Sequence, residues 1–410
     1  MARHIRYEWV STASSQNSSI CYNLATGVVR RGYVCWLAMI AASIILNNEE
    51  GIVMSEQTCD VADMSSWPSR NHVRAFYSGH SLSEGVPEVV AQIAGSLGYQ
   101  LDFETQVLGY SLLRQRTKGE VPSASDWPGY RSGQNREGAG LDVAEELRQP
   151  RRLAPGDTYD VLVVTERHDL PAVARKERTV FYLTDMAKHL LAGNPEAEVF
   201  LYQSWLPVNL EVPLRWIDYE RAVSPMWECI ASRANLELQP RGDAPRVRLL
   251  PGGSALAELA AALWEGSVPG VASASPAGRV RLLFSDNVHM SDFGRYFIGL
   301  VNYVVLFGDR PDGAVIPTGL SQATGRHLQA LAWQFAVSYG KRANAVAGRD
   351  MAACRALMQK QICPAYAAFR YGNGMPMLAT LKRLVKTYSC RRDYANARDH
   401  ENPFASLEDE

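Results

Sequence analysis

Three residue types that together can hydrolyse an ester occur in two short motifs of this 410-residue sequence. Ser81 lies just after an apolar run at residues 73–77, and Asp286 and His289 lie just after another at residues 280–284. Short apolar runs that end in turn-forming residues are typical of buried strands. Open α/β sheets carry their sites at the carboxyl ends of the strands, so we expect a nucleophile, a base and an acid to meet there.

The expected chemistry is that of a catalytic triad. Ser81 would attack the carbonyl carbon of an ester while His289 takes its proton and later delivers it to the leaving alcohol. Asp286 would hold the other imidazole nitrogen and stabilise the imidazolium. Taken singly, each residue also has an ordinary structural explanation: a turn serine, a core histidine and a helix-capping aspartate. The two motifs in this order favour catalysis.

The motifs resemble those of the SGNH or GDSL hydrolase superfamily, over roughly residues 73–308. The family's first block reads Gly-Asp-Ser-Leu and carries the nucleophile, and the sequence Gly79-His80-Ser81-Leu82 differs from it only in the histidine. We expect His80 to shape the turn; the alternative is that it donates a hydrogen bond toward the pocket. The family's last block, Asp-x-x-His, is matched by Asp286 and His289. The residues that usually follow this block are also present: Ser291, Gly294 and Tyr296.

The family's middle blocks supply the oxyanion hole, and the resemblance implies three candidate donors. Gly109 follows the second expected strand, where the family has its oxyanion-hole glycine. His168 stands in place of the family's asparagine, because Asp169 aligns with the aspartate of the third block. Arg167 and the backbone amides of Ser81 and Gly109 are alternatives. Losing one such donor typically costs about 3 kcal/mol of transition-state stabilisation.

The α/β-hydrolase fold is the nearest alternative, since it also orders serine, acid and histidine along the chain. Its turn motif is Gly-x-Ser-x-Gly, whereas this sequence has Ser83 at the fifth position. Its acid and histidine normally come from separate loops. The three-residue step between Asp286 and His289 therefore favours the SGNH interpretation.

Substrate binding is expected to involve the long connection after Gly109, which runs to residue 157. Trp127 and Tyr130 within it are candidates for stacking on a sugar or aryl group, or for pinning the loop onto the core; Trp205 and Pro207 carry the same two interpretations. The resembled family sets the reaction and not the substrate. We expect a short-chain acyl ester, such as an acetyl ester, on a polar or carbohydrate substrate. Alternatives are an arylesterase or lipase-like hydrolase, a sugar acyltransferase, and a degenerate member that binds without cleaving.

Alternating strand-like and helix-like stretches predict a three-layer α/β/α sandwich around a parallel five-stranded, flavodoxin-like sheet. The expected strands are residues 73–77, 100–108, 159–164, 198–202 and 280–284. The main helices expected between them are residues 86–97, 180–191 and 218–234. Residues 247–250 and 254–264 read as one further strand–helix unit. The glycine pair at its turn lacks the Gly-Lys-Ser/Thr ending of a phosphate loop.

Three regions are expected along the chain: an N-terminal segment (1–70), the hydrolase domain (71–310) and a helical C-terminal extension (311–410). Helices are expected at residues 327–339, 345–358 and 377–388, and a disordered polar tail from Arg391. The apolar run 33–46 follows two arginines, as in a secretory signal or anchor. It favours a periplasmic or secreted protein. A start of translation near residue 28 would fit that pattern better, a start at Met54 would leave a cytoplasmic enzyme, and the run also fits an ordinary helix.

Composition is that of an ordinary soluble globular protein, with 47% hydrophobic and 21% charged residues. A formal net charge of -1 creates no field that would attract nucleic acid, and beyond the run 33–46 no stable membrane partner is expected. The seven cysteines show no metal-binding spacing. Neither a metal nor another cofactor is expected. Cys354 and Cys363 are either paired with each other or reduced.

Overall fold

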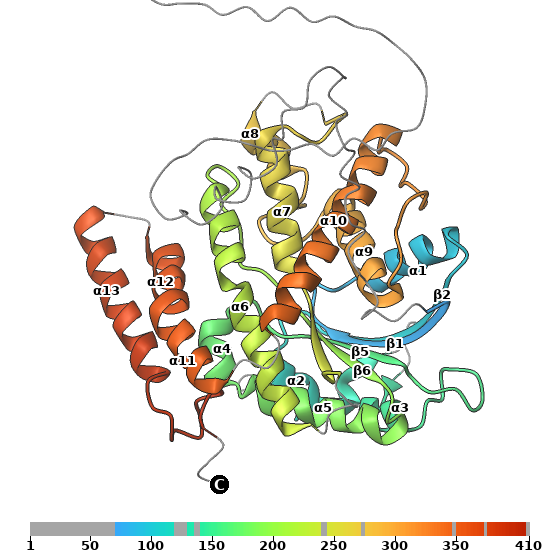
Figure 1. The fold of residues 1–410 in the computed structure, drawn as a ribbon, viewed down its shortest axis with the longest axis horizontal. Coiled ribbons are helices and arrows are strands. Elements are labelled where there is room, and N and C mark those ends of the chain that lie inside the picture. The colour runs from blue at the N-terminus through green and yellow to red at the C-terminus, as the bar shows by residue number, and fades with distance from the viewer. Residues whose placement is uncertain are drawn as a thin grey trace, which may run out of the picture. The chain divides into compact units, whose positions relative to one another are not determined.

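Five parallel strands form the central sheet of the computed structural model (Figure 1). The structure describes residues 70–118, 129–134, 140–238, 244–271, 275–346, 350–372 and 375–406. The strands are β1 (His72–Gly79), β2 (Gln100–Val107), β5 (Val161–Thr165), β6 (Glu198–Tyr202) and β7 (Val247–Leu250). Their spatial order, β2-β1-β5-β6-β7, is that of flavodoxin-like folds. The expected fold class is confirmed.

The order of the strands reverses between β1 and β5, and this is where open α/β sheets bind their ligands. All five residues of β5 are buried, because helices cover both faces of the sheet. In β1 an alternation of half-buried and buried residues gives way to full burial toward its carboxyl end. The residues just after β1 and β5 therefore leave the core at the switch point.

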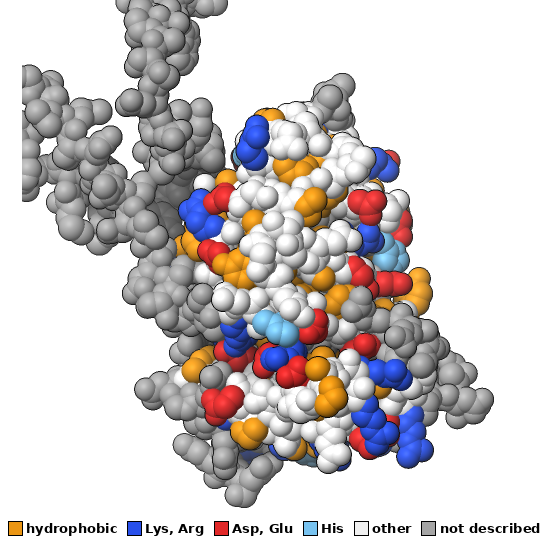
Figure 2. All heavy atoms as spheres, turned by 90° about the vertical axis from the view of Figure 1, so that its right-hand side faces the viewer, with side chains coloured by type: hydrophobic (Ala, Val, Ile, Leu, Met, Phe, Trp, Pro, Cys, Tyr) orange, Lys and Arg blue, Asp and Glu red, His pale blue; other side chains and the backbone are white. Residues whose placement is uncertain are grey.

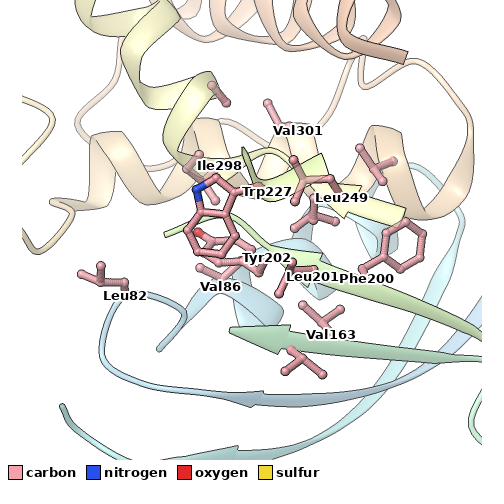
Figure 3. Packing of buried hydrophobic residues seen from close by; sticks show 14 of the residues in the cluster. Leu82, Val86, Val163, Phe200, Leu201, Tyr202, Trp227, Leu249, Ile298 and Val301 are labelled. Carbon is pink, nitrogen blue, oxygen red and sulfur yellow. The ribbon is translucent and has the colours of Figure 1, made fainter. Parts of the chain in front are cut away.

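Helices cover the sheet in two layers. On one face lie α1 (Val86–Ser96), α7 (Gly252–Glu265) and α9 (Asp292–Phe307), and on the other lie α2 (Leu113–Thr117), α3 (Val143–Arg148) and α5 (Thr179–Gly193) (Figure 1). The long helix α6 (Leu214–Glu237) packs on both α5 and α7. In the core, side chains of β5, β6 and β7 meet those of α6 and α9 (Figure 3).

Short elements fill the connections. Between β2 and β5 lie the 3-10 helix η1 (Gly129–Ser132) and a two-stranded antiparallel ribbon, β3 (Gly133–Gln134) and β4 (Gly140–Leu141). The helix α4 (Leu170–Lys176) follows β5.

The expected strand at residues 280–284 is wrong. These residues belong to the end of α8 (Pro276–Arg281) and to the turn after it, and Phe284 forms only an isolated bridge with Met290. Val280, Leu283 and Phe284 are buried while Leu282 is 42% exposed, which is helical rather than alternating spacing. The fifth strand is β7 at residues 247–250, which the sequence predicted only as an additional unit.

The C-terminal region is helical, as expected. It comprises α10 (Gln322–Val346), α11 (Met351–Leu357), the π-helical turn η2 (Met358–Ile362), α12 (Cys363–Tyr371) and α13 (Pro376–Asp393). The single helix expected at residues 345–358 is not formed. Asp350 instead starts α11, accepting a hydrogen bond from the Ala353 amide.

Two disulfides hold this region together, and neither joins Cys354 to Cys363. Cys229 of α6 pairs with Cys354 of α11, and Cys363 of α12 pairs with Cys390 of α13. The alternative that these cysteines are reduced is also wrong. Because 125 residues separate Cys229 from Cys354, sequence spacing gave no indication of that partner.

The tail expected to be disordered from Arg391 is folded as far as residue 406. Tyr394 and Phe404 are buried and stack on each other, and the Tyr394 hydroxyl donates to the Pro171 carbonyl oxygen over 2.8 Å. Arg175 of α4 forms a 2.7 Å ion pair with Asp399. These aromatic and charged contacts give the polar tail partners on α4 that its composition did not reveal.

The expected signal or anchor run at residues 33–46 and the start at Met54 lie outside the described residues. Among the helices that are described, none is both long and apolar enough to cross a bilayer.

Candidate active site

A chain of hydrogen bonds links Ser81, His289 and Asp286 at the switch point of the sheet. His289 Nε2 lies 3.0 Å from Ser81 Oγ, and its Nδ1 lies 2.6 Å from Asp286 Oδ2. Since a carboxylate can only accept, Nδ1 carries the proton and Nε2 is left to accept the serine proton. The His289 side chain is 33% exposed, so a substrate can reach these groups from solvent.

Ser81 is positioned by a tight turn between β1 and α1. A Cβ atom at Gly79 would lie 2.0 Å from Ser83 Oγ and 2.9 Å from Thr165 Oγ1, so only glycine allows this close approach. The Ser83 amide and hydroxyl both donate to the His80 carbonyl oxygen, over 2.9 Å each. Leu82 is buried beside the turn (Figure 3). The hydroxyl of Ser81 is thereby held outward between anchored neighbours.

His80 is a buried structural residue in this turn. Its Nε2 donates to the Glu166 carbonyl oxygen over 3.2 Å, and its Nδ1 accepts from the Leu82 amide over 3.3 Å. Burial, together with the nearby positive charge of Arg116, lowers the pKa of His80 to about 3. His80 is therefore neutral at ordinary pH and ties the nucleophile turn to the end of β5.

The loop carrying Asp286 and His289 is fixed to the segment after β6. Trp205 is buried and its indole Nε1 donates to the Val288 carbonyl oxygen over 2.8 Å. The Val208 amide donates to the Asn287 carbonyl oxygen over 2.7 Å. Of the two interpretations of Trp205, these contacts support the structural one, because the indole holds the loop from the core side.

The carboxylate of Asp286 is organised by its own loop. Partial burial would by itself raise its pKa, but hydrogen bonds from the His289 ring and from the amides of His289 and Val288 outweigh this effect. The pKa of Asp286 is lowered to about 2. Each of the two amides lies 2.7 Å from Oδ1, which leaves Oδ2 to the imidazole. The acid is ionised and oriented before any substrate binds.

A buried cluster around Arg116 and Glu166 connects the strand ends and the loop next to the site. The Arg116 guanidinium donates to Ser78 Oγ over 3.0 Å and also to the carbonyl oxygens of Ser111 and Thr165. Burial lowers the pKa of Arg116 to about 10, while the negative charge of Glu166 opposes this shift. One side chain thus joins the ends of β1 and β5 to the β2–α2 loop.

Glu166 is the acidic member of this cluster. Its carboxylate accepts from the Leu113 amide over 3.1 Å, the Arg167 amide over 2.7 Å and the Thr179 hydroxyl over 3.0 Å. Burial raises the pKa of Glu166, and the hydrogen bonds and the charge of Arg116 offset only part of this increase. Neither Arg116 nor Glu166 was predicted as part of the site.

The candidate oxyanion donors Gly109, Arg167 and His168 follow the strands β2 and β5, at the edge of the sheet that also carries Ser81. The register pairs Gly79 with Val107, so Gly109 and Ser81 are each two residues past paired positions. His168 lies beside His80, with 6.4 Å between ring centroids, and its Nδ1 is buried with no hydrogen-bond partner in the described residues. Burial, together with the positive charge of Arg167, lowers the pKa of His168 to about 4, so the imidazole is neutral.

Trp127 and Tyr130 are the two aromatic candidates for substrate binding in the long connection. Trp127 lies outside the described residues. Tyr130 donates from its hydroxyl to Asp185 over 2.7 Å and packs edge-on against His189, both on α5. These contacts match the interpretation that Tyr130 pins the loop, and we give it no substrate role below.

Glu220 of α6 contacts the segment after β6, to which the loop with Asp286 and His289 is fixed. The burial of Glu220 leads to a prediction. Its Oε1 accepts from the Leu206 amide over 2.8 Å, yet burial dominates and raises its pKa to about 8 from 4.5. The folded state therefore binds this proton more tightly than the unfolded state, so the free energy of unfolding falls as pH rises from about 4.5 to about 8.

Glu220→Gln should remove this pH dependence. At pH 8 we expect stabilisation of up to about 4 kcal/mol, and near pH 4.5 little change, measured by urea unfolding at both values. Glu258→Gln is the matched control, because Glu258 is 44% exposed and paired with Arg221. An equal effect of Glu220→Gln at the two pH values would contradict the assignment.

An open hollow adjoins the acid–base loop. It is lined by Pro207, Val208, Asn209, Leu210, Glu211, Arg281 and Asn287. Asn287 is the residue after Asp286, so the hollow begins next to the proposed triad. Its lining is mixed: three of the seven residues are apolar, and the other four are polar or charged.

Comparison with protein-family models and with curated proteins finds no match. Among solved structures, the chain is similar to a DUF4886 family protein from Bacteroides uniformis, at 12% identity and a TM-score of 0.45, over 66% of this chain and 96% of that one. It is also similar to a two-domain esterase (CEX) active on acetylated mannans, at 11% identity and a TM-score of 0.32, over 62% of this chain. The match spans 54% of that esterase. Both likenesses are distant, and we base the function on the geometry of the site.

Proposed function

We propose that this protein is a serine ester hydrolase of the SGNH type, with Ser81 as nucleophile, His289 as base and Asp286 as orienting acid. The observation that carries the proposal is the continuous hydrogen-bond chain from Ser81 Oγ through the imidazole to Asp286. Ser81 supplies one end of this chain and Asp286 the other, although the two residues are 205 positions apart in the sequence. The hydrogen bond to Asp286 also selects the tautomer of His289 that a general base needs, with Nε2 free to accept the proton of Ser81.

The reaction follows from this geometry. Ser81 Oγ attacks the ester carbonyl carbon while its proton passes to His289 Nε2, and the ionised Asp286 stabilises the resulting imidazolium. The imidazolium protonates the leaving alcohol, and a water activated by the same imidazole then cleaves the acyl-enzyme. His168, Arg167 and the amides of Ser81 and Gly109 are our candidates for the oxyanion hole. His168 suits the role because a buried neutral imidazole can donate without bringing a charge.

For the substrate, we propose a short acyl ester, such as an acetyl ester, on a polar or carbohydrate alcohol. The polar and charged residues in the mixed lining of the hollow beside Asn287 support this choice, because they can form hydrogen bonds with such an alcohol. We also propose that the enzyme is exported to the periplasm or secreted. The two disulfides support export, since such bonds persist in oxidising compartments and are rare in the cytosol. Finding the protein in the cytoplasmic fraction of its own cells would contradict export.

Hydrolysis of aryl esters of graded acyl length by the wild type and His289→Ala tests both parts of the proposal. We expect kcat/KM to be highest for acetyl and to fall with chain length, and His289→Ala to lower kcat by about 10³-fold or more. His72→Ala is the matched control, because His72 also pairs with an aspartate, Asp102, but at the amino end of β1. Full activity of His289→Ala would refute the mechanism, and a preference for long acyl chains would refute the substrate class.

A further inference from the structure

The helix α13 presents an exposed apolar stripe. Its six large hydrophobic side chains are 47–84% exposed: Met377, Leu378, Leu381, Leu384, Val385 and Tyr388. At 100° per residue they fall within one third of the helix circumference, so they form a single face. Monomeric proteins rarely expose contiguous apolar patches of this kind without a function. We refer to this set as the α13 stripe.

Basic residues accompany the α13 stripe. Between Pro376 and Arg392 the helix carries five exposed cations and no Asp or Glu: Lys382, Arg383, Lys386, Arg391 and Arg392. Its last residue, Asp393, lies 3.8 Å from Arg175 of α4. Elsewhere the surface is mixed: on the face shown in Figure 2, acidic and basic side chains are interspersed. The chain as a whole has a net charge of -1, so the positive charge of α13 is a local feature.

The opposite side of α13 is fixed to the rest of the protein. Ala379 is buried, and Cys390 forms the disulfide with Cys363 of α12. The Lys386 ammonium lies 5.7 Å from the centre of the Tyr371 ring, also on α12. The helix lies at the outer side of the molecule, beyond α12 (Figure 1). It therefore cannot turn its stripe inward without breaking these contacts, and the stripe faces outward.

We propose that α13 docks this protein on an anionic lipid surface. A helix with an apolar face and a cationic remainder lies in the plane of a membrane interface, with the apolar side chains among the acyl chains and the cations at the head groups. Anionic lipids attract such cations, and the attraction fades within a Debye length. A second copy of the chain fits the stripe less well, because two copies of α13 would bring like charges together.

Sedimentation of the full chain with lipid vesicles tests the proposal. We expect binding to phosphatidylcholine vesicles that contain about 30% phosphatidylglycerol, and at least about tenfold weaker binding to pure phosphatidylcholine or in high salt. The double variant Leu381→Glu/Leu384→Glu, and separately Lys382→Gln/Arg383→Gln, should each weaken binding by at least about tenfold. Because all four side chains are exposed, unchanged melting temperatures will show that the variants are folded.

The matched control exchanges equally exposed apolar residues elsewhere. Leu236 and Val315 are 53% and 47% exposed, and Leu236→Glu/Val315→Glu should bind vesicles like the wild type. Three results would overturn the proposal: no binding to anionic vesicles, binding that the α13 variants retain but a chain lacking residues 1–69 loses, or a stripe-dependent dimer in the absence of lipid. The second would assign the binding to the N-terminal apolar run, and the third to a second copy.

Discussion

Ser81→Ala is expected to lower kcat for ester hydrolysis by about 10⁴- to 10⁶-fold, because it removes the atom that forms the acyl-enzyme. The fold should be unaffected, since Ser81 is partly exposed and its neighbours Leu82 and Ser83 anchor the turn. Initial rates with an aryl acetate measure the effect. KM should change much less than kcat, because the hydroxyl acts mainly in the transition state.

Ser83→Ala is the matched control for this experiment. Ser83 lies two residues further along the same turn, and its buried hydroxyl donates to the His80 carbonyl oxygen over 2.9 Å. Losing that bond should cost about 1 kcal/mol of stability and leave most of the activity. If Ser83→Ala were as inactive as Ser81→Ala, the loss would reflect a damaged turn and not a missing nucleophile.

Arg116→Met is expected to have the largest effect on stability, lowering the free energy of unfolding by about 3–5 kcal/mol. The substitution leaves acceptors at Ser78, Ser111 and Thr165 buried without their donor, and it removes the positive charge that lowers the pKa of Glu166. Urea unfolding measures the loss. Arg116→Lys should recover little of it, because an ammonium cannot reproduce the planar fork that joins three chain segments.

A surface arginine provides the comparison. Arg131 is 79% exposed and lies 3.7 Å from Asp142, so Arg131→Met should change the free energy of unfolding by less than about 1 kcal/mol. An Arg116→Met protein that unfolds at the same urea concentration as the Arg131→Met protein would show that the buried cluster does not stabilise the fold.

Much of the fold could be predicted because its signals are local. The strand β5 is buried throughout and apolar up to its last residue, Thr165, as expected for the centre of a parallel sheet. The error at residues 280–284 arose because a short apolar run fits a strand and a buried helical turn equally well. The helix start was nevertheless present in the sequence: Ser275 caps α8 by accepting from the Gly278 amide, and Pro276 follows it.

The site could be predicted only where its residues belong to short motifs. Asp286 and His289 lie three residues apart, so their hydrogen bond is a local property. Arg116 shows the limit: nothing in the sequence separates it from Arg114, which pairs with Glu177 and is partly exposed. Arg116 is buried only because the ends of β1 and β5 and the β2–α2 loop meet around it. The structural role of Trp205 could not be predicted either, because its acceptor, the carbonyl oxygen of Val288, lies 83 residues further along the chain.

Covalent labelling with a fluorophosphonate, followed by mass spectrometry of the peptides, tests the catalytic centre most directly. The reagent reacts with a serine only where an adjacent base activates the hydroxyl. We predict a single adduct on Ser81 of the wild-type protein and none on the His289→Ala variant. Labelling of a different serine, or no labelling of the folded wild-type protein, would contradict the assignment of Ser81 as an activated nucleophile.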